Sequence, residues 1–596
     1  MNQYTVTLNK PESHLVEITV HVDRLDQNFI DFTLPAWSPG SYLIRDYSKN
    51  VVKVEAFDRA RNPLSLQKLD KSTWRVDLHG QSECKVVYQV YCHEISTHSS
   101  FVDNSHATLQ GPDLYLYPQG KQDEPCKVTL KFPSSWKTIS TGLTPLPHSR
   151  NTFSAPDYDA LIDTPIEIGN HAIYRFTVRG VPHDIALYGK GNLNPKQLVT
   201  DVQQIVEHSF PIFRDLPYSH YVFIMHLLPG ERGGGGLEHR NSTVIQMNRW
   251  KFLPEEEYRK KLSLIAHEYF HLWNVKRLAP KPLVNFDYTT ENYTDLLWMA
   301  EGFTSYYEDL ILVRAKLLTP TQYFETVCED YKFYLESPGR EIQSLCESSF
   351  DSWTKFYGLR EGARNLTISY YQKGALVGLG LDLLIRKATQ GHKSLDDVMR
   401  HLYQETFVKV QTGYDLNDLK KTSKAVAKIS LDNFFSNYVE GHAELPLGDW
   451  IKPFGLRLVP KEEKPISGYF GIEIRKEENR PLIGNVPWNT PAHKAGFCAG
   501  DEIVAFDGMK VSLDSLPQRI KESKPGSVHR VHVFRLEEML EIPITVGEKP
   551  KSDWRIDVVK NASASIRKQL TAWLGSFPDS KGSKDSHPKQ AIKKKA

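Results

Sequence analysis

The alternation of hydrophobic and polar residues in the first third of the chain predicts β-strands. Short segments with an apolar residue at every second position are separated by Pro, Gly, Asn and Asp, and helical periodicity is almost absent. Examples are Leu15–Val22, Val86–Tyr91 and Ile173–Val178. We therefore expect a β-sandwich-like N-terminal domain over residues 1–190.

The pattern changes near residue 195, where apolar residues begin to recur at spacings of three and four. A mostly helical domain is expected over residues 191–450, with one pair of strands at Tyr221–Leu228 and Val244–Met247. The most apolar long stretch, Gly374–Ile385, contains Asp382 and is too short to span a membrane. It therefore predicts a buried helix.

The C-terminal part of the chain returns to short strands. A charged linker ends near residue 465, and residues 466–548 predict a small strand-rich domain. Residues 549–577 are expected to form a helical segment, and the polar, Lys-rich residues 578–596 a disordered basic tail. The predicted fold class is multidomain α+β.

Charge and composition argue against several classes of protein. The chain has 74 Lys and Arg against 72 Asp and Glu, a net charge of +2, so no nucleic-acid or anionic membrane partner is expected. Six scattered cysteines without a CxxC pair predict neither a disulfide scaffold nor a thiolate metal site. Because we find no signal peptide and no membrane span, we expect a cytoplasmic protein.

The sequence HEYFH at residues 267–271 is the strongest chemical signal. Pro254 followed by three glutamates predicts the start of a helix. On that helix, His267 and His271 lie one turn apart on the same face, so both imidazoles can bind one zinc ion. Glu268 is then close enough to take a proton from a water at the ion. The alternative is an HExxH string that arose by chance.

Two histidines leave zinc one protein ligand short. The segment Leu296–Tyr307 predicts a second buried helix, in which Glu301 lies in an otherwise apolar turn. Because an isolated buried carboxylate is costly unless it is paired or bound to a cation, we expect Glu301 to be the third ligand. Glu308 and Asp309 are the competing acids. A second string, HExxxH at residues 93–98, has the wrong spacing for one helix face and is not expected to bind metal.

The stretch HEYFHLWNVKRLAP (residues 267–280), followed by WMAEGF (298–303), resembles the gluzincins, zinc metallopeptidases with a glutamate ligand. It most closely resembles the glycyl aminopeptidase family, whose members carry a PDZ domain. LPAWSPGSYLIRDYSKNV (34–51) and LIDTPIEIG (161–169) resemble the same family. The resemblance implies a β N-terminal domain, a thermolysin-like catalytic domain with one Zn²⁺, and a C-terminal PDZ domain. It also implies an aminopeptidase that prefers Gly or Ala at the free N-terminus of peptides.

GGGGLEH at residues 233–239 resembles the GxMEN element of zinc aminopeptidases, with Leu and His where that element has Met and Asn. The resemblance implies that Gly235 and Gly236 allow the backbone to approach the substrate, and that Glu238 binds the substrate's α-ammonium. The alternative is a flexible loop with a glutamate on the surface.

SYYQKGAL at residues 369–376 resembles the YxKG segment of the same superfamily. This implies that the Tyr371 hydroxyl donates a hydrogen bond to the oxyanion, whereas Tyr370 is the candidate for packing in the core. SGYFGI at residues 467–472 resembles the carboxylate-binding loop of PDZ domains, so the C-terminus of a peptide is a candidate partner.

The leading hypothesis is a zinc-dependent aminopeptidase in which Glu268 is the general base. An endopeptidase on the same scaffold, with another role for Glu238, is one alternative. A PDZ adaptor protein with a relic zinc site is another, although the intact set of ligands counts against it.

Overall fold

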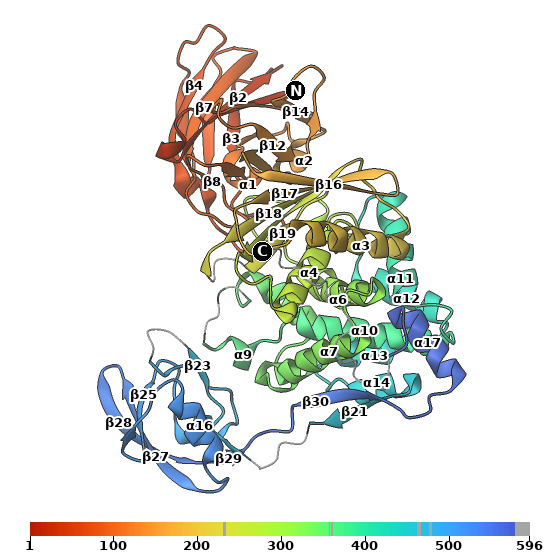
Figure 1. Ribbon diagram of the computed structural model, residues 1–596. Helices are drawn as coiled ribbons and strands as arrows, with labels where there is room; N and C mark the ends of the chain where they lie inside the picture. Colours follow the sequence, from red (N-terminus) through yellow and green to blue (C-terminus); the bar gives the residue numbers. More distant parts are fainter. Residues whose placement is uncertain (231–233, 357, 359–360, 462–466, 476–479, 579–596) are drawn as a thin grey trace, which may run out of the picture.

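The computed structural model describes residues 1–230, 234–356, 358, 361–461, 467–475 and 480–578. Figure 1 shows a β-rich region at the top, a helical region in the middle and a small strand-rich region at the lower left. The basic tail predicted over residues 578–596 lies outside the described residues from 579 onward. In the part of the chain that is described, no helix has the length and apolar character needed to cross a membrane.

The N-terminal region consists of three sheets that share one hydrophobic core. In β2 (Leu15–Asp23) and β7 (Glu83–Tyr91) every second residue is buried, as the alternating sequence predicts. Both lie in a seven-stranded sheet of order β13-β14-β11-β1-β2-β7-β4. The smaller sheets have the orders β10-β3-β6-β5 and β12-β15-β9-β8. The other strands of the three sheets are Asn2–Thr7 (β1), Phe29–Thr33 (β3), Val51–Phe57 (β4), Leu66–Lys68 (β5), Thr73–Asp77 (β6), Phe101–Val102 (β8), Ala107–Leu109 (β9), Tyr117–Pro118 (β10), Cys126–Lys131 (β11), Thr138–Thr141 (β12), Thr144–Pro145 (β13), Thr152–Ala155 (β14) and Ile166–Gly169 (β15).

The middle region begins with a five-stranded sheet of order β16-β17-β18-β20-β19. Its strands are Ala172–Val178 (β16), Val181–Tyr188 (β17), Tyr221–Leu228 (β18), Gly234–Glu238 (β19) and Ser242–Asn248 (β20). Helix α3 (Pro195–Phe213) forms the crossover between the parallel strands β17 and β18. The glycine-rich segment is therefore an antiparallel edge strand, β19, rather than only a loop, and it lies against helix α4 (Glu255–Phe270).

Strands β16 and β17 pack with the helices rather than with the N-terminal sheets. They continue into β18 by backbone pairing, and Phe176, Ile185 and Leu187 are buried in the same core as the helices. Alternating residues predict a strand but do not say which sheet it joins. We therefore propose a boundary near residue 171 in place of residue 190.

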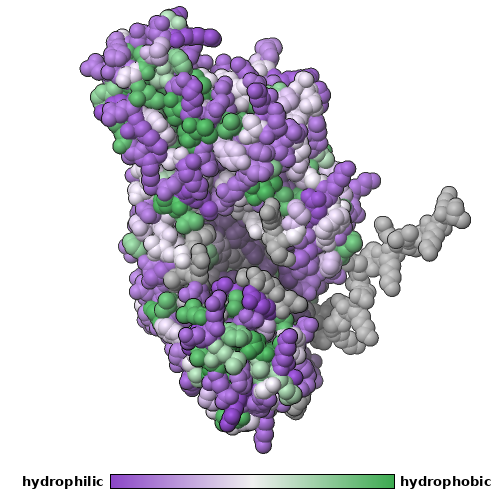
Figure 2. All heavy atoms as spheres, turned by 90° about the vertical axis from the view of Figure 1, so that its left-hand side faces the viewer, coloured by the Kyte–Doolittle hydropathy of each residue, from purple (hydrophilic) through white to green (hydrophobic). Residues whose placement is uncertain are grey.

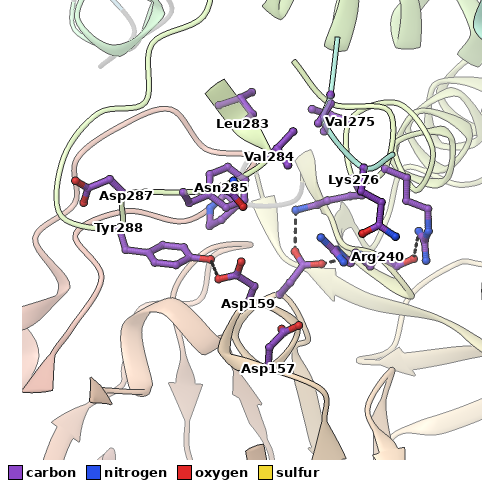
Figure 3. A pocket seen from close by; sticks show the side chains of 18 of the residues that line it. Asp157, Asp159, Arg240, Val275, Lys276, Leu283, Val284, Asn285, Asp287 and Tyr288 are labelled. Carbon is purple, nitrogen blue, oxygen red and sulfur yellow. Dashed lines mark hydrogen bonds and ion pairs between the residues drawn. The ribbon is translucent and has the colours of Figure 1, made fainter. Parts of the chain in front are cut away.

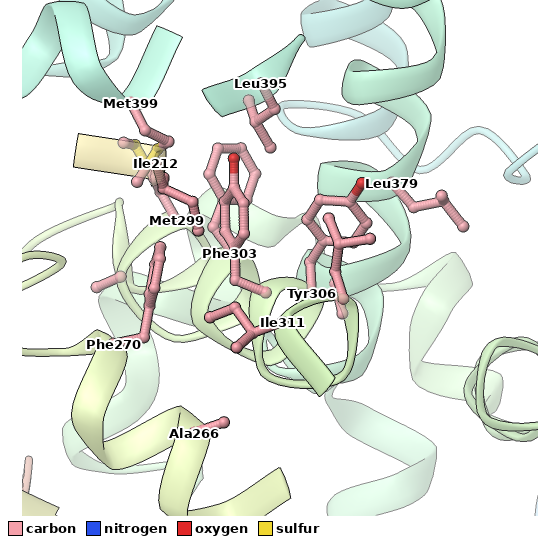
Figure 4. Close-up of a cluster of buried hydrophobic side chains, with 14 of the residues drawn as sticks. Ile212, Ala266, Phe270, Met299, Phe303, Tyr306, Ile311, Leu379, Leu395 and Met399 are labelled. Carbon is pink, nitrogen blue, oxygen red and sulfur yellow. The ribbon is translucent and has the colours of Figure 1, made fainter. Parts of the chain in front are cut away.

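The helices of the middle region surround a large apolar core. Figure 4 shows Phe270, Met299, Phe303 and Tyr306 among the side chains that meet there. The main helices are α4, α5 (Leu297–Ala300), α6 (Gly302–Arg314), α7 (Pro320–Leu335), α10 (Gln372–Ala388), α11 (Leu395–Leu402) and α12 (Leu416–Ala427). Helix α10 contains the stretch predicted to be a buried helix.

Two helices differ from the prediction. The helix predicted to carry both His267 and His271 ends at Phe270, with His271 as its C-cap residue. The helix expected over Leu296–Tyr307 is divided into α5 and α6, and Glu301 lies at their junction.

The small strand-rich domain, predicted to be a PDZ domain, is inserted into the middle region. Strand β21 (Leu456–Pro460) pairs with β30 (Trp554–Val558), and the PDZ strands lie between them in sequence. Helix α17 (Ala564–Leu574) then returns to the middle region and buries Trp573 in its core. The PDZ elements are Gly468–Tyr469 (β22), Glu473–Arg475 (β23), Leu482–Asn485 (β24), Pro491–Ala495 (α15), Glu502–Phe506 (β25), Met509–Lys510 (β26), Ser515–Glu522 (α16), Val528–Arg535 (β27), Glu538–Thr545 (β28) and Gly547–Glu548 (β29). The predicted multidomain α+β class is thus confirmed.

Candidate metallopeptidase active site

The three predicted metal ligands converge on one point. His267 comes from the last turn of α4, His271 from its C-cap, and Glu301 from the junction of α5 and α6. Glu301 Oε2 lies 3.4 Å from His267 Nε2 and 3.2 Å from His271 Nε2. In a tetrahedral site with bonds of about 2.0–2.1 Å, two ligand atoms are about 3.3–3.4 Å apart, so this donor set fits a zinc ion.

The outer nitrogen of each histidine has an acceptor, so that Nε2 faces the shared point. His267 Nδ1 lies 2.5 Å from Glu308 Oε2, and His271 Nδ1 lies 2.7 Å from the Asn274 carbonyl oxygen. Such partners determine the tautomer and the orientation of a metal-binding imidazole. Of the two competing acids, Glu308 therefore supports His267, whereas Asp309 accepts a hydrogen bond from Ser263 instead.

Asn274 ties the turns that follow α4 to the segment that carries Glu301. Its side-chain amide donates to the carbonyl oxygens of Met299 and Ala300 and to Thr304 Oγ1. Turns follow Phe270, and they bring the Asn274 carbonyl back to His271. Asn274 was not predicted from the sequence, because an asparagine three residues after a histidine forms no distinctive pattern.

The Glu268 carboxylate is buried beside the three candidate ligands, and its Oε2 atom has no hydrogen-bond partner among the described residues. Burial raises the pKa of Glu268 to about 7; Glu238 and Glu301 add to this rise, while His267 and His271 oppose it. Burial would also raise the pKa of Glu301, but the two histidines outweigh it and hold that pKa at about 2. The two carboxyl groups therefore differ in proton affinity, as a base and a ligand require.

Gly236 on β19 lies directly against Glu268. A Cβ atom at residue 236 would be 2.2 Å from the Glu268 Cδ atom, so only glycine leaves the carboxylate where it is. Gly235 has a φ of 145° and no neighbour that a Cβ would meet. The two predicted glycines thus differ. Gly236 makes room for the Glu268 side chain, whereas Gly235 allows a backbone conformation that other residues rarely adopt.

Glu238 ends the edge strand next to this site. It is 3% exposed, its Oε1 atom has no partner among the described residues, and it approaches Glu268 and His271 closely enough to form one group of ligand atoms. On its other side lies Gly40, which has a φ of 94° and whose Cβ would be 2.5 Å from Glu238 Oε1. The alternative of a flexible loop with a surface glutamate is therefore not observed, and Glu238 is a buried carboxylate whose Oε1 atom has no cationic partner among the described residues.

Tyr371 is the N-cap residue of α10 and lines the same cavity. Its ring stacks on His267 with the ring centroids 6.2 Å apart. Tyr370 is fully buried and lies in the core, as predicted. Tyr371 is thus the tyrosine that faces the candidate site.

Two cavities meet at Gly40 and Glu238. The smaller, of about 210 Å³, contains the candidate ligands, Glu268 and Tyr371. The larger, of about 810 Å³, runs between the N-terminal and middle regions. In Figure 3 Asp157 and Asp159 lie on one side of it and the loop from Leu283 to Tyr288 on the other. Figure 2 shows a hollow lined with polar residues across the middle of one face of the molecule.

The N-terminal domain contributes a wall of the small cavity that the sequence analysis missed. This wall consists of Gly40, Ser41, Arg45, Thr97 and His98. Burial and the neighbouring Arg45 lower the pKa of His98 to about 3. Residues 34–51 resemble the glycyl aminopeptidase family, although they lie outside the metal site. Nothing in their sequence predicted that they line the candidate active site.

Comparisons with known proteins agree with this arrangement. Residues 3–170 match the model of the Peptidase M61 N-terminal domain, residues 260–377 that of M61 glycyl aminopeptidase, and residues 468–546 that of a PDZ domain. The crystal structure of an aminopeptidase N family protein from Idiomarina loihiensis is 30% identical, with a TM-score of 0.89 over 96% of this chain and 100% of that chain.

Two further matches cover a smaller share of this chain. An M1 zinc metallopeptidase from Deinococcus radiodurans, solved with a Tyr-Ser-Ala substrate, is 13% identical over 75% of this chain and 94% of that chain, with a TM-score of 0.48. A serine endoprotease DegS from Haemophilus influenzae is 32% identical over 99 residues, which are 16% of this chain and only 29% of the DegS chain.

The fold and the candidate site together define a metallopeptidase, in which the HExxH helix and a glutamate at the junction of two neighbouring helices surround one candidate metal position. The matched domains and the full-length structural relative narrow this class further. The chain belongs to the M61 glycyl aminopeptidase family of PDZ-containing metallopeptidases.

Proposed function

We propose that the protein is an aminopeptidase that binds one zinc ion through His267, His271 and Glu301 and removes small residues, Gly or Ala, from the free N-terminus of peptides. The observation that carries this proposal is the buried Glu238 carboxylate, which has an oxygen without a partner among the described residues, next to the candidate metal position. A buried carboxylate requires a cation, and the substrate's α-ammonium supplies it. The volume of the small cavity, about 210 Å³, supports a small N-terminal residue.

A zinc ion held by His267, His271 and Glu301 would polarise the scissile carbonyl and make water a stronger nucleophile. Glu268 takes the proton of the attacking water and delivers it to the leaving amine. The Tyr371 hydroxyl donates a hydrogen bond to the developing oxyanion. Glu238 holds the ammonium and so positions the first peptide bond, while Gly235 and Gly236 let the substrate backbone approach β19. We also keep the prediction that the protein is cytoplasmic.

The test compares Gly- and Ala-nitroanilide with their N-acetylated forms. We expect hydrolysis of the free amines only, and a Glu238→Gln variant should lose most of this preference because its amide carries no charge. Glu268→Gln should keep its zinc, measured by elemental analysis, and lose turnover. Equal rates on free and acetylated substrates would reject the role of Glu238. If the zinc-loaded wild type shows no turnover, both peptidase hypotheses are rejected and the PDZ adaptor hypothesis is favoured.

An endopeptidase is the second candidate, and the larger cavity favours it. This cavity of about 810 Å³ continues beyond Glu238, where a strict aminopeptidase binds no further substrate residues. Cleavage of an internally quenched, N-blocked peptide by the wild type, and not by Glu268→Gln, would support this candidate.

We further propose that the PDZ domain binds the C-terminus of a peptide. A groove of about 480 Å³ lies between residues 467–472 and helix α16, and Ile472, Ile520 and Lys521 are among the residues that line it. PDZ domains bind such peptides by strand addition, and main-chain N–H groups hold the carboxylate. A labelled peptide should bind with a free C-terminus and not with an amidated one.

A further inference from the structure

The wall that the N-terminal domain contributes to the small cavity carries one permanent positive charge. Among the described residues that line this cavity, Arg45 is the only Lys or Arg, and it lies in a cavity that also contains Glu238, Glu268 and Glu301. Arg45 forms no ion pair within the described part of the chain. The hydrogen bonds of its guanidinium therefore indicate which kind of ligand the small cavity can bind.

Arg45 has unused hydrogen-bonding capacity. Its Nη2 group donates to Ser41 Oγ at 2.8 Å, whereas the buried Nε group has no acceptor among the described residues. Arg75, in the same domain, shows the usual alternative, because it binds Asp31 through Nε and Nη2 at 2.8 Å each. A partly buried guanidinium whose Nε group has no acceptor is stabilised when a ligand supplies one.

Hydrogen bonds within the N-terminal domain hold the backbone around Arg45 in place. Its backbone N–H donates to the Ala36 carbonyl oxygen at 2.7 Å. The hydroxyl of Tyr47 lies 2.6 Å from Ser38 Oγ and donates to the His98 carbonyl oxygen at 3.0 Å, which ties the loop to the second segment of the wall. A side chain anchored in this way can select substrates, because little ordering is needed on binding.

We propose that Arg45 is a specificity-determining residue that binds a carboxylate group of the substrate. The inference rests on the proposed function: Glu238 binds the ammonium of the substrate, and Arg45 binds an anion in the same cavity. A planar guanidinium matches a carboxylate through two parallel hydrogen bonds. Two sources supply this group: an acidic side chain on the N-terminal residue, which would add Asp to the Gly and Ala of the proposed function, or the C-terminal carboxylate of a dipeptide.

The experiment uses two substrate pairs that differ only in the carboxylate. Asp- and Ala-nitroanilide test the acidic side chain, and Ala-Ala and its C-terminal amide test the terminal carboxylate. We expect Arg45→Met to lower the kcat/KM ratio of one pair about 10- to 100-fold relative to the wild type. Arg45→Lys should keep part of the ratio, because it retains the charge and loses the fork. Arg59→Met, at an exposed arginine paired with Glu83, is the matched control and should leave both ratios unchanged.

Binding supplies a readout that does not depend on turnover. Ala-Ala, its amide and free Asp should be titrated into zinc-loaded Glu268→Gln with and without Arg45→Met, and loss of the preference for the carboxylate ligand supports the proposal. Unchanged ratios in both assays overturn it, as does an equal loss on both members of each pair, which would indicate a contact with the peptide backbone. If Arg45→Met lowers the melting temperature, the substrate ratios of Arg45→Lys are used in its place to test the proposal. Failure of the wild type to hydrolyse Ala-nitroanilide rejects the proposed function instead.

Discussion

Gly236→Ala places a methyl group against Glu268, the proposed general base, and substitutes none of the candidate metal ligands. The new Cβ would lie 2.2 Å from Glu268 Cδ and 2.3 Å from Oε1. Since an ordinary contact is about 3.5 Å or more, the carboxylate must move by roughly 1 Å. A displacement of this size at a reacting group costs about 100-fold in rate, which lies within the roughly 10²–10⁴-fold that a general base contributes.

The fold should tolerate the same substitution. The atoms in contact are the end of a flexible side chain, and alanine in a strand is roughly 0.5–1 kcal/mol more favourable than glycine. We therefore expect Gly236→Ala to keep its zinc and its melting temperature while kcat for Ala-nitroanilide falls about 100-fold.

Gly234→Ala is the matched control for this prediction, because it lies two residues away on β19 and its Cβ would meet nothing within 4 Å. It should retain activity within about threefold of the wild type, far less than the loss expected from a displaced base. A Gly236→Ala enzyme that is as active as Gly234→Ala would refute the assignment of Glu268 as the base.

Three further predictions follow from the described contacts. Glu308→Gln removes the carboxylate acceptor of His267 and should weaken zinc binding about 10- to 100-fold in a chelator competition; unchanged affinity would contradict this role. Glu268 acts only when it is ionised, burial raises its pKa to about 7, and a bound dication lowers that value. The kcat/KM of the wild type should therefore fall as the pH drops through a pKa at or below about 7, and a rate that rises toward pH 5 would contradict it. Glu167 is fully buried between His106 and His226, at 2.8 and 3.1 Å, so Glu167→Gln should lower the free energy of unfolding by about 3–5 kcal/mol in urea titrations near pH 7. Although burial opposes them, the two histidines hold the pKa of Glu167 below its usual value, so this stabilisation is full above the unfolded-state pKa of about 4.3 and fades as the pH falls below it; an equal loss at pH 3 would be inconsistent.

The metal position could be predicted because its parts are local. Two histidines four residues apart share a helix face wherever a helix forms, and the signals for that helix lie beside them. Glu301 could be predicted because a lone carboxylate in an apolar segment needs a cation. The prediction of a single helix around Glu301 was wrong, because the break between α5 and α6 depends on contacts with Asn274 and the core.

The surroundings of the metal position depend on segments that are distant in sequence. Gly40 and Arg45 belong to a loop more than 190 residues before Glu238, and only the packing of the N-terminal domain on the middle region brings them together. The same holds for strands β16 and β17, whose alternating residues predict strands but not the sheet they join. Periodicity reports which face of an element is apolar, and the covering element is chosen by long-range packing. The amino-acid sequence by itself thus determined the candidate metal ligands and the candidate base, whereas the tertiary structure decided which side chains enclose the candidate site.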